Sequence, residues 1–169
     1  NDVAVAARAL LAEGAVRRVV VIDLDVHQGD GTAAILGSDP AVFTLSAHCR
    51  TNFPARKERS TRDLALDPDM GDRAYLAAVE PLVEAALEAF RPDLVFYNAG
   101  VDPHIDDRLG RLALTDQGLA ARDAAVLEAC RRRGLPLAVV VGGGYAEDVA
   151  TVAARHALLH EVAAELAPW

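Results

Sequence analysis

The sequence is short of basic residues and of long apolar runs, and each shortage argues against a class of protein. Its 17 lysines and arginines stand against 25 acidic residues, which gives a formal net charge of −8. No basic stripe can dominate such a surface, so we expect no nucleic-acid partner. No apolar run approaches the roughly 18 residues that a membrane-spanning helix needs, and no secretory signal is evident. We therefore expect a cytoplasmic protein with no membrane partner.

Cysteine is also scarce, because the chain has only Cys49 and Cys130. The two lie far apart and match no metal-ligand spacing. A single disulfide is one alternative, and two free thiols in a reducing cytoplasm are the expectation.

The remaining composition is that of a folded domain, with 52% hydrophobic and 25% charged residues. A chain of 169 residues fits a single domain, so we treat residues 1–169 as one unit. The first residue is Asn1 rather than methionine, and the opening segment has a helical pattern from its first residues. We therefore expect a further segment to precede it.

Apolar β-branched runs alternate with helical patterns along the chain. Strands are predicted at residues 18–22, 41–46, 92–98 and 135–141. Helices are predicted at residues 2–14, 72–90, 115–133 and 147–166. Pro81 is expected to kink or split the second helix, and residues 49–71 are expected to form a long polar loop.

The predicted strands are apolar along their full length, which is typical of a parallel sheet covered by helices on both faces. The fold class is therefore α/β. In open parallel sheets, reactive groups gather beyond the carboxyl ends of the strands.

Polar residues follow two of these strands. Asp23, Asp25 and His27 follow the first, and Asp102 follows the third. Alternate strand residues point to the same face, and carboxylates gathered at the end of an apolar strand need a cation beside them. Asp25, His27 and Asp102 would hold a divalent metal and leave a position open, which suits a catalytic site and a neutral substrate group such as an amide. The alternative is a turn in which the aspartates cap backbone groups and His27 is merely buried.

A glycine run, Gly142-Gly143-Gly144-Tyr145, follows the fourth strand. One interpretation is a phosphate cradle at the next helix, although the spacing of known phosphate-binding loops is absent. The other is that the glycines let the backbone pass close to a substrate and place Tyr145 over the metal, where a phenol can donate a hydrogen bond to an oxyanion. A purely structural tyrosine is the third alternative.

Three ordered motifs resemble those of the zinc-dependent histone deacetylase superfamily. They are V-I-D-L-D-V-H-Q-G-D-G-T, N-A-G-V-D-P-H-I-D-D-R-L-G and V-G-G-G-Y, and S-A-H-C-R-T-N-F-P resembles the class IV-like and bacterial branch. The resemblance covers about residues 1–160 and implies the arginase/deacetylase fold with a central parallel sheet.

The resemblance also implies residue roles, position by position. Asp25, His27 and Asp102 would be the zinc ligands, and Tyr145 would polarise the amide carbonyl. A monovalent-cation site for potassium would include Asp23 and Ser46. The substrate-binding positions would be Phe53, Leu109 and Gly143.

The implied reaction is hydrolysis of an acetyl-lysine or acetylpolyamine amide by zinc-activated water. Iron(II), manganese or cobalt would also suit so oxygen-rich a site. A related metallohydrolase that acts on another C–N bond, as arginase does, ranks below this interpretation.

One feature of the family is missing from these residues. Its general base belongs to a His-His pair that would precede Asn1, and the sequence contains no adjacent histidines. The expectation is therefore either the C-terminal portion of a deacetylase catalytic domain or a metal-binding remnant that cannot turn over. A portion missing upstream would leave apolar surface exposed, which favours association, including a homo-oligomer.

Overall fold

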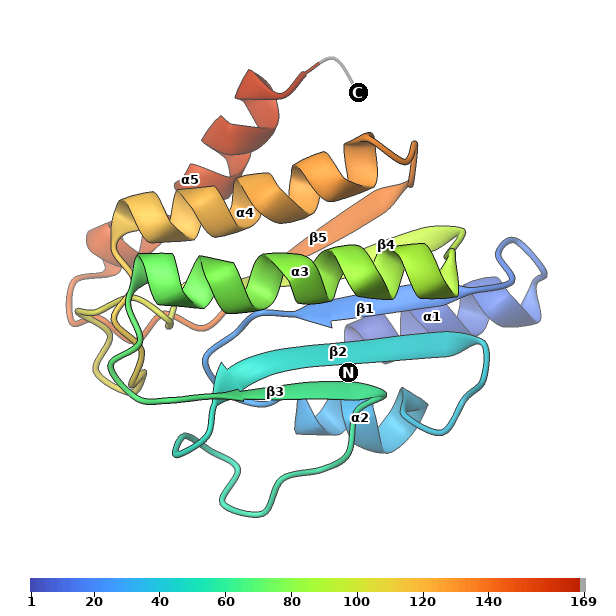
Figure 1. Cartoon of the computed structure of the whole chain (residues 1–169), viewed down its shortest axis with the longest axis horizontal. Helices are drawn as coiled ribbons and strands as arrows, with labels where there is room; N and C mark the ends of the chain where they lie inside the picture. The colour runs from blue at the N-terminus through green and yellow to red at the C-terminus, as the bar shows by residue number, and fades with distance from the viewer. Residues whose placement is uncertain (168–169) are drawn as a thin grey trace.

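The computed structural model describes residues 1–167, and its elements form a parallel sheet between two layers of helices (Figure 1). In chain order the elements are α1 (Asp2–Ala12), β1 (Val19–Asp23), α2 (Asp30–Leu36), β2 (Val42–Cys49), β3 (Arg62–Leu66), α3 (Asp72–Phe90), β4 (Leu94–Gly100), α4 (Asp116–Arg131), β5 (Leu137–Gly142) and α5 (Val149–Glu165). The strand order is β3-β2-β1-β4-β5, which confirms the predicted α/β class.

β1 lies at the centre of the sheet, and all five of its residues are buried. Val19 pairs with Val42 of β2 on one side and with Leu94 of β4 on the other. All strand pairs are parallel, so the carboxyl ends of the strands meet along one edge. In the strand order, β2 and β3 follow outwards from β1 on one side, and β5 follows outwards from β4 on the other. Ligands of such sheets bind where the order reverses, which here is between β1 and β4.

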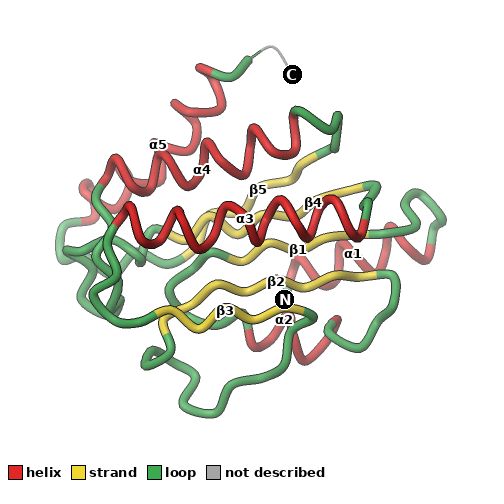
Figure 2. Tube along the Cα trace, in the orientation of Figure 1, coloured by secondary structure: helices red, strands yellow, loops and turns green. Residues whose placement is uncertain are grey.

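The side chains of successive β1 residues pack in two different hydrophobic cores, one on each face of the sheet, because strand side chains alternate between the faces. Val20 and Ile22 pack in the core beneath α3 and α4, and Val19 and Val21 pack against α1 and α2. The tube view shows the same two layers (Figure 2). A strand buried on both faces explains the unbroken apolar run.

Three local predictions need correction. Residues 49–71 are not wholly irregular, because β3 pairs with β2 inside that segment, with Leu45 opposite Arg62. The short helix α2 was not expected. Pro81 does not split α3, which is one helix from Asp72 to Phe90. Proline has no N–H, so the carbonyl group four residues earlier in the helix lacks its usual donor. Because Pro81 is exposed, water can bind that carbonyl group instead.

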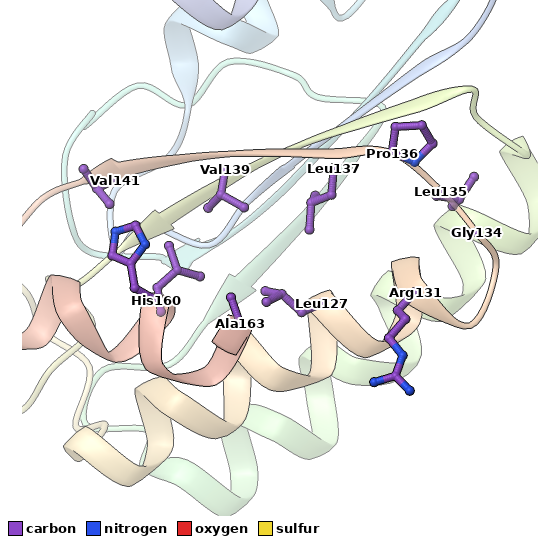
Figure 3. A pocket seen from close by; sticks show the side chains of 11 residues that line it. Leu127, Arg131, Gly134, Leu135, Pro136, Leu137, Val139, Val141, His160 and Ala163 are labelled. Atoms are coloured by element: carbon purple, nitrogen blue, oxygen red, sulfur yellow. The ribbon is translucent and has the colours of Figure 1, made fainter. Parts of the chain in front are cut away.

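β3 and β5 are the two outermost strands of the sheet. None of the residues of β5 is fully buried. Val141 is 54% exposed. An apolar groove of about 700 Å³ runs between β5, the end of α4 and α5 (Figure 3). It is lined by Leu127, Arg131, Gly134, Leu135, Pro136, Leu137, Val139, Val141, Leu159, His160 and Ala163.

Two further expectations concern the cysteines and membranes. Cys49 and Cys130 are buried free thiols, as expected. Among residues 1–167, no helix has the length and apolar character that crossing a bilayer requires.

Truncating a core side chain of α4 should destabilise the protein strongly. Leu127 is 1% exposed, so Leu127→Ala should lower the free energy of unfolding in urea by about 2–5 kcal/mol. Gln117 is exposed on the same helix, and Gln117→Ala should change that energy by less than about 0.5 kcal/mol. A loss below about 1 kcal/mol for Leu127→Ala would contradict its place in the core.

Candidate metal centre

Three side chains that can bind a metal meet beyond the ends of β1 and β4. Nδ1 of His27 lies 3.1 Å from Oδ1 of Asp25 and 3.0 Å from Oδ2 of Asp102. One ligand atom from each of the three residues lies within 4.8 Å of the other two. Asp102 is fully buried, and His27 and Asp25 are partly buried. The structure thus brings together the three residues that the sequence singled out.

Backbone hydrogen bonds orient these carboxylates. Oδ1 of Asp25 accepts a hydrogen bond from the backbone N–H of His27 at 2.9 Å. Oδ1 of Asp102 accepts one from the backbone N–H of Val26 at 2.9 Å. The second bond joins the segment after β4 to the segment after β1, 76 residues earlier in the chain. Part of the alternative prediction is also right, because Asp25 caps the backbone of His27 and Asp23 caps the backbone of Asp25.

Glycines allow the backbone to approach these carboxylates. A Cβ on Gly100 would lie 2.6 Å from Oδ2 of Asp25. A Cβ on Gly143 would lie 2.4 Å from Oδ2 of Asp102, and Gly143 also has a φ of +62°. Gly143 was predicted to bind substrate, and the structure places it against the carboxylate of Asp102.

The charges of the cluster are poorly balanced without a cation. Hydrogen bonds to Asp102 and then to Asp25 raise the pKa of His27 to about 10. Burial raises the pKa of Asp102, and the nearby Asp25 carboxylate adds to that rise. Because of both pKa shifts, protons stay bound among these crowded carboxylates. A metal ion that binds here would displace those protons and take over their positive charge. Carboxylate oxygen and imidazole nitrogen are accepted zinc ligands, so this donor set fits a divalent metal.

Tyr145 lies at the rim of this cluster. Its ring contacts the ring of His27 edge to face, with centroids 6.0 Å apart and planes at 88°. Its backbone N–H donates a hydrogen bond to Oδ2 of Asp107 at 2.7 Å, and its side chain is 43% exposed. Burial raises the pKa of the phenol, with a further contribution from Asp102. Tyr145 therefore keeps its proton and can donate a hydrogen bond at neutral pH.

The predicted pocket residues Phe53 and Leu109 are exposed, at 69% and 52%. They belong to segments joined by Asn52, whose Nδ2 donates to the carbonyl oxygen of Leu109 at 2.6 Å and lies 3.5 Å from Nε2 of His27. The carboxylate of Asp107 accepts hydrogen bonds from the backbone of Leu109 and of Tyr145. Sequence reasoning missed both Asn52 and Asp107, although each lies inside a motif that it quoted.

Asp23 and Ser46, the predicted monovalent-cation positions, face each other across β1 and β2. Asp23 accepts hydrogen bonds from the side chain of Asn98 at 2.9 Å and from the backbone N–H of Asp25 at 3.1 Å. Burial raises the pKa of Asp23 to about 8, and Asp25 adds to that rise. The hydroxyl of Ser46 lies 3.0 Å from Nδ1 of His48. Both residues are buried, and Asp23 lies beside the candidate metal-binding cluster of Asp25, His27 and Asp102.

Comparison with known proteins identifies the family of the chain. The family model described as the histone deacetylase domain matches residues 1–160. The chain belongs to the histone deacetylase family. An uncharacterized protein of Picosynechococcus sp. is 48% identical over 98% of this chain and 55% of its own length. A histone deacetylase-like amidohydrolase of Pseudomonas aeruginosa is 36% identical over 86% of this chain and 42% of its own length.

Solved structures also resemble this deacetylase-family chain. An acetylpolyamine aminohydrolase from Burkholderia pseudomallei superposes with a TM-score of 0.79 and 26% identity, over 96% of this chain and 48% of that one. The arginase/deacetylase fold is therefore confirmed. The chain spans about half the length of these relatives.

The protonation of His27 can be tested in protein stripped of metal. Its pKa lies near 10 because of its hydrogen bonds to Asp102 and Asp25, so its imidazole NMR signals should not titrate below about pH 8. The pKa of His48 is lowered by burial, so His48 should titrate below 6.5 in the same spectra. Asp102→Asn should move the pKa of His27 down towards 6.5.

The sign of the linked stability change follows from the same shift. Folding raises the pKa of His27, so the protonated imidazole stabilises the folded protein. This contribution to the free energy of unfolding is fully present below about pH 6.5 and is lost as the pH rises to about 10. The free energy of unfolding of the metal-free protein should therefore fall over that range, and should fall less in Asp102→Asn. A His27 that titrates near 6.5 in the unaltered protein would contradict this picture.

Proposed function

We propose that this chain carries the metal centre and the catalytic tyrosine of a zinc-dependent hydrolase that removes an acetyl group from the amide of a lysine or a polyamine. The observation that carries the proposal is the meeting of Asp25, His27 and Asp102 within 4.8 Å. A metal bound by these residues supplies Lewis acidity, which polarises an amide carbonyl and acidifies water. Iron(II), manganese and cobalt remain alternatives to zinc.

The residues around the cluster suit an amide substrate. Tyr145 is positioned by Asp107 and by contact with His27, and its phenol would donate a hydrogen bond to the oxyanion that develops on the amide carbonyl. Exposed apolar side chains of Phe53 and Leu109 lie on segments next to the cluster and would exclude water from the acyl-amine chain. The printed names of relatives, an amidohydrolase and an acetylpolyamine aminohydrolase, support an acylated amine.

We also propose that a monovalent cation, for which potassium is the natural candidate, binds beside this centre at Asp23 and Ser46. Support comes from their burial on adjacent strands and from the raised pKa of Asp23, which burial and Asp25 cause. A cation there would favour the ionised carboxylate.

A second candidate function is metal binding without turnover. It is favoured by the absence of adjacent histidines from the 169 residues, because loss of a general base costs about 10²–10⁴ in rate. The two candidates differ in one assay, hydrolysis of a fluorogenic acetyl-lysine peptide by the zinc-loaded 169-residue chain. Rapid metal-dependent hydrolysis would reject the second candidate, which predicts zinc binding without hydrolysis.

The ligand and tyrosine assignments make distinct predictions for the native protein. Asp102→Ala should abolish stoichiometric zinc binding, measured by elemental analysis after dialysis, together with hydrolysis. Tyr145→Phe should keep zinc, because Tyr145 is not a ligand, and should lower the turnover number by about 10²-fold or more. Asp102→Ala with full zinc content would show that the ligand set is wrong.

Two glycines with similar backbone conformations provide a matched pair. Gly143 and Gly134 have φ values of +62° and +61°, but a Cβ on Gly134 would meet nothing within 4 Å, whereas one on Gly143 would meet Asp102. Both alanine variants should therefore lose stability from backbone strain, by about 1 kcal/mol for Gly134→Ala. Only Gly143→Ala should also weaken zinc binding, measured by competition with a chromophoric chelator. Equal zinc affinities would contradict the close approach to Asp102.

A further inference from the structure

Arg122 of α4 is a fully buried cation on which no part of the proposed reaction depends. Its side chain is 1% exposed, although arginine is almost never buried without partners. Its Nε donates to Oδ1 of Asp123 at 2.9 Å, and its Nη2 lies 2.8 Å from the same oxygen. The hydroxyl of Tyr97 donates to that oxygen as well. Arg122, Asp123 and Tyr97 thus form a charge-balanced cluster inside the core.

The remaining nitrogen of the guanidinium reaches the sheet. Nη1 of Arg122 donates to the backbone carbonyl oxygen of Gly100 at 2.6 Å and lies 3.3 Å from that of Leu24. Leu24 directly precedes Asp25, and Gly100 lies two residues before Asp102. One nitrogen therefore contacts both strand ends, one residue before Asp25 and two residues before Asp102.

This contact lies where the pairing of the two strands stops. The register between β1 and β4 ends with Asp23 opposite Asn98, and the N–H of Leu24 donates to the carbonyl oxygen of Asn98. Beyond that point the carbonyl groups of Leu24 and Gly100 turn to a donor from α4. The guanidinium thus continues the link between the two strands.

We propose that Arg122 is a positioning residue that sets the separation of Asp25 and Asp102 by holding the carbonyl groups of Leu24 and Gly100. The inference rests on the proposed function, because it assigns to those carboxylates the binding of one metal ion. Arg122 is buried, and its contacts with these two carbonyl groups mean that it acts through the backbone. Its charge is offset by Asp123, so it does not act by repelling the metal.

The geometry of arginine suits this task. Its rigid planar group presents donors in fixed directions, so the side that holds Asp123 fixes where Nη1 points. Asp123 and Tyr97 in turn hold the guanidinium in place. A lysine at this position would offer one flexible ammonium group and could not keep both sets of partners.

The test measures metal affinity and stability separately. Zinc and cobalt(II) affinities of Arg122→Met and of the unaltered chain would be measured by chelator competition, and unfolding would be followed in urea. Arg122→Met should weaken binding of both metals by about 10- to 100-fold, as loss of outer contacts does at other metal sites. It should also alter the visible spectrum of bound cobalt(II), which reports the ligand geometry.

Leu127→Ala is the matched control, because it removes from the same helix a buried side chain that has no donor for the carbonyl groups of Leu24 and Gly100. It should lose stability and keep the affinity and cobalt spectrum of the unaltered chain. Arg122→Lys should fall between Arg122→Met and the unaltered chain, and it replaces Arg122→Met if that variant does not fold.

Two results would overturn the inference. One is an unchanged metal affinity in a folded Arg122 variant. The other is an equal loss of affinity in Leu127→Ala, which would mean that Arg122 affects metal binding only by stabilising the fold. If the unaltered chain bound neither zinc nor cobalt(II), the proposed function would fail and this inference with it. Binding by the unaltered chain with no effect of Arg122 would overturn only the inference.

Discussion

The hydrogen bond from the backbone N–H of Val26 to Asp102 joins the segments that leave β1 and β4, and the metal-binding cluster depends on it. It can form because the two strands are parallel neighbours whose carboxyl ends lie at one edge of the sheet. Gly100 and Gly143 then let the backbone come within contact distance of the two carboxylates. Little room is left for the carboxylates to move, so their positions are set by the sheet rather than by a flexible loop.

The same crowding fixes the electrostatics. Asp25 and Asp102 lie close together and are largely shielded from solvent, and His27 lies within hydrogen-bonding distance of both. Such a group of charges must either retain protons or bind a cation. Without a cation, protons are retained: hydrogen bonds to Asp102 and Asp25 raise the pKa of His27, and burial raises the pKa of Asp102. A divalent ion offers the other solution, which is why the electrostatic and the geometric arguments point to the same function.

Much of this organisation could be predicted from the sequence, because apolar β-branched runs and glycine-flanked polar strand ends are local signals. The α/β class and the convergence of the residues after β1 and β4 followed from them. β3 was not predicted, since this edge strand begins with Arg62 and Asp63 and its apolar run, Leu64 to Leu66, is too short to stand out beside a long polar segment. Its existence depends on a tertiary contact.

The supporting residues of the site were hidden for a similar reason. Asn52, Asp107 and Arg122 act on backbone groups distant in sequence, and no spacing rule identifies such partners. Arg122 is one of several arginines in the segment predicted to be a helix, and only its burial in the structure distinguishes it from the others. Roles that depend on side chains meeting remote carbonyl groups need coordinates.

The two halves of the metal-binding cluster are separated by 75 residues of chain between His27 and Asp102. An unfolded polypeptide cannot hold such distant donors around one ion, so the ion would bind almost exclusively to the native state. Mass action then makes folding sensitive to free metal, since a concentration one hundred times the dissociation constant adds about 2.7 kcal/mol. A cell that supplied or withheld the metal would thereby control how long this protein survives proteolysis.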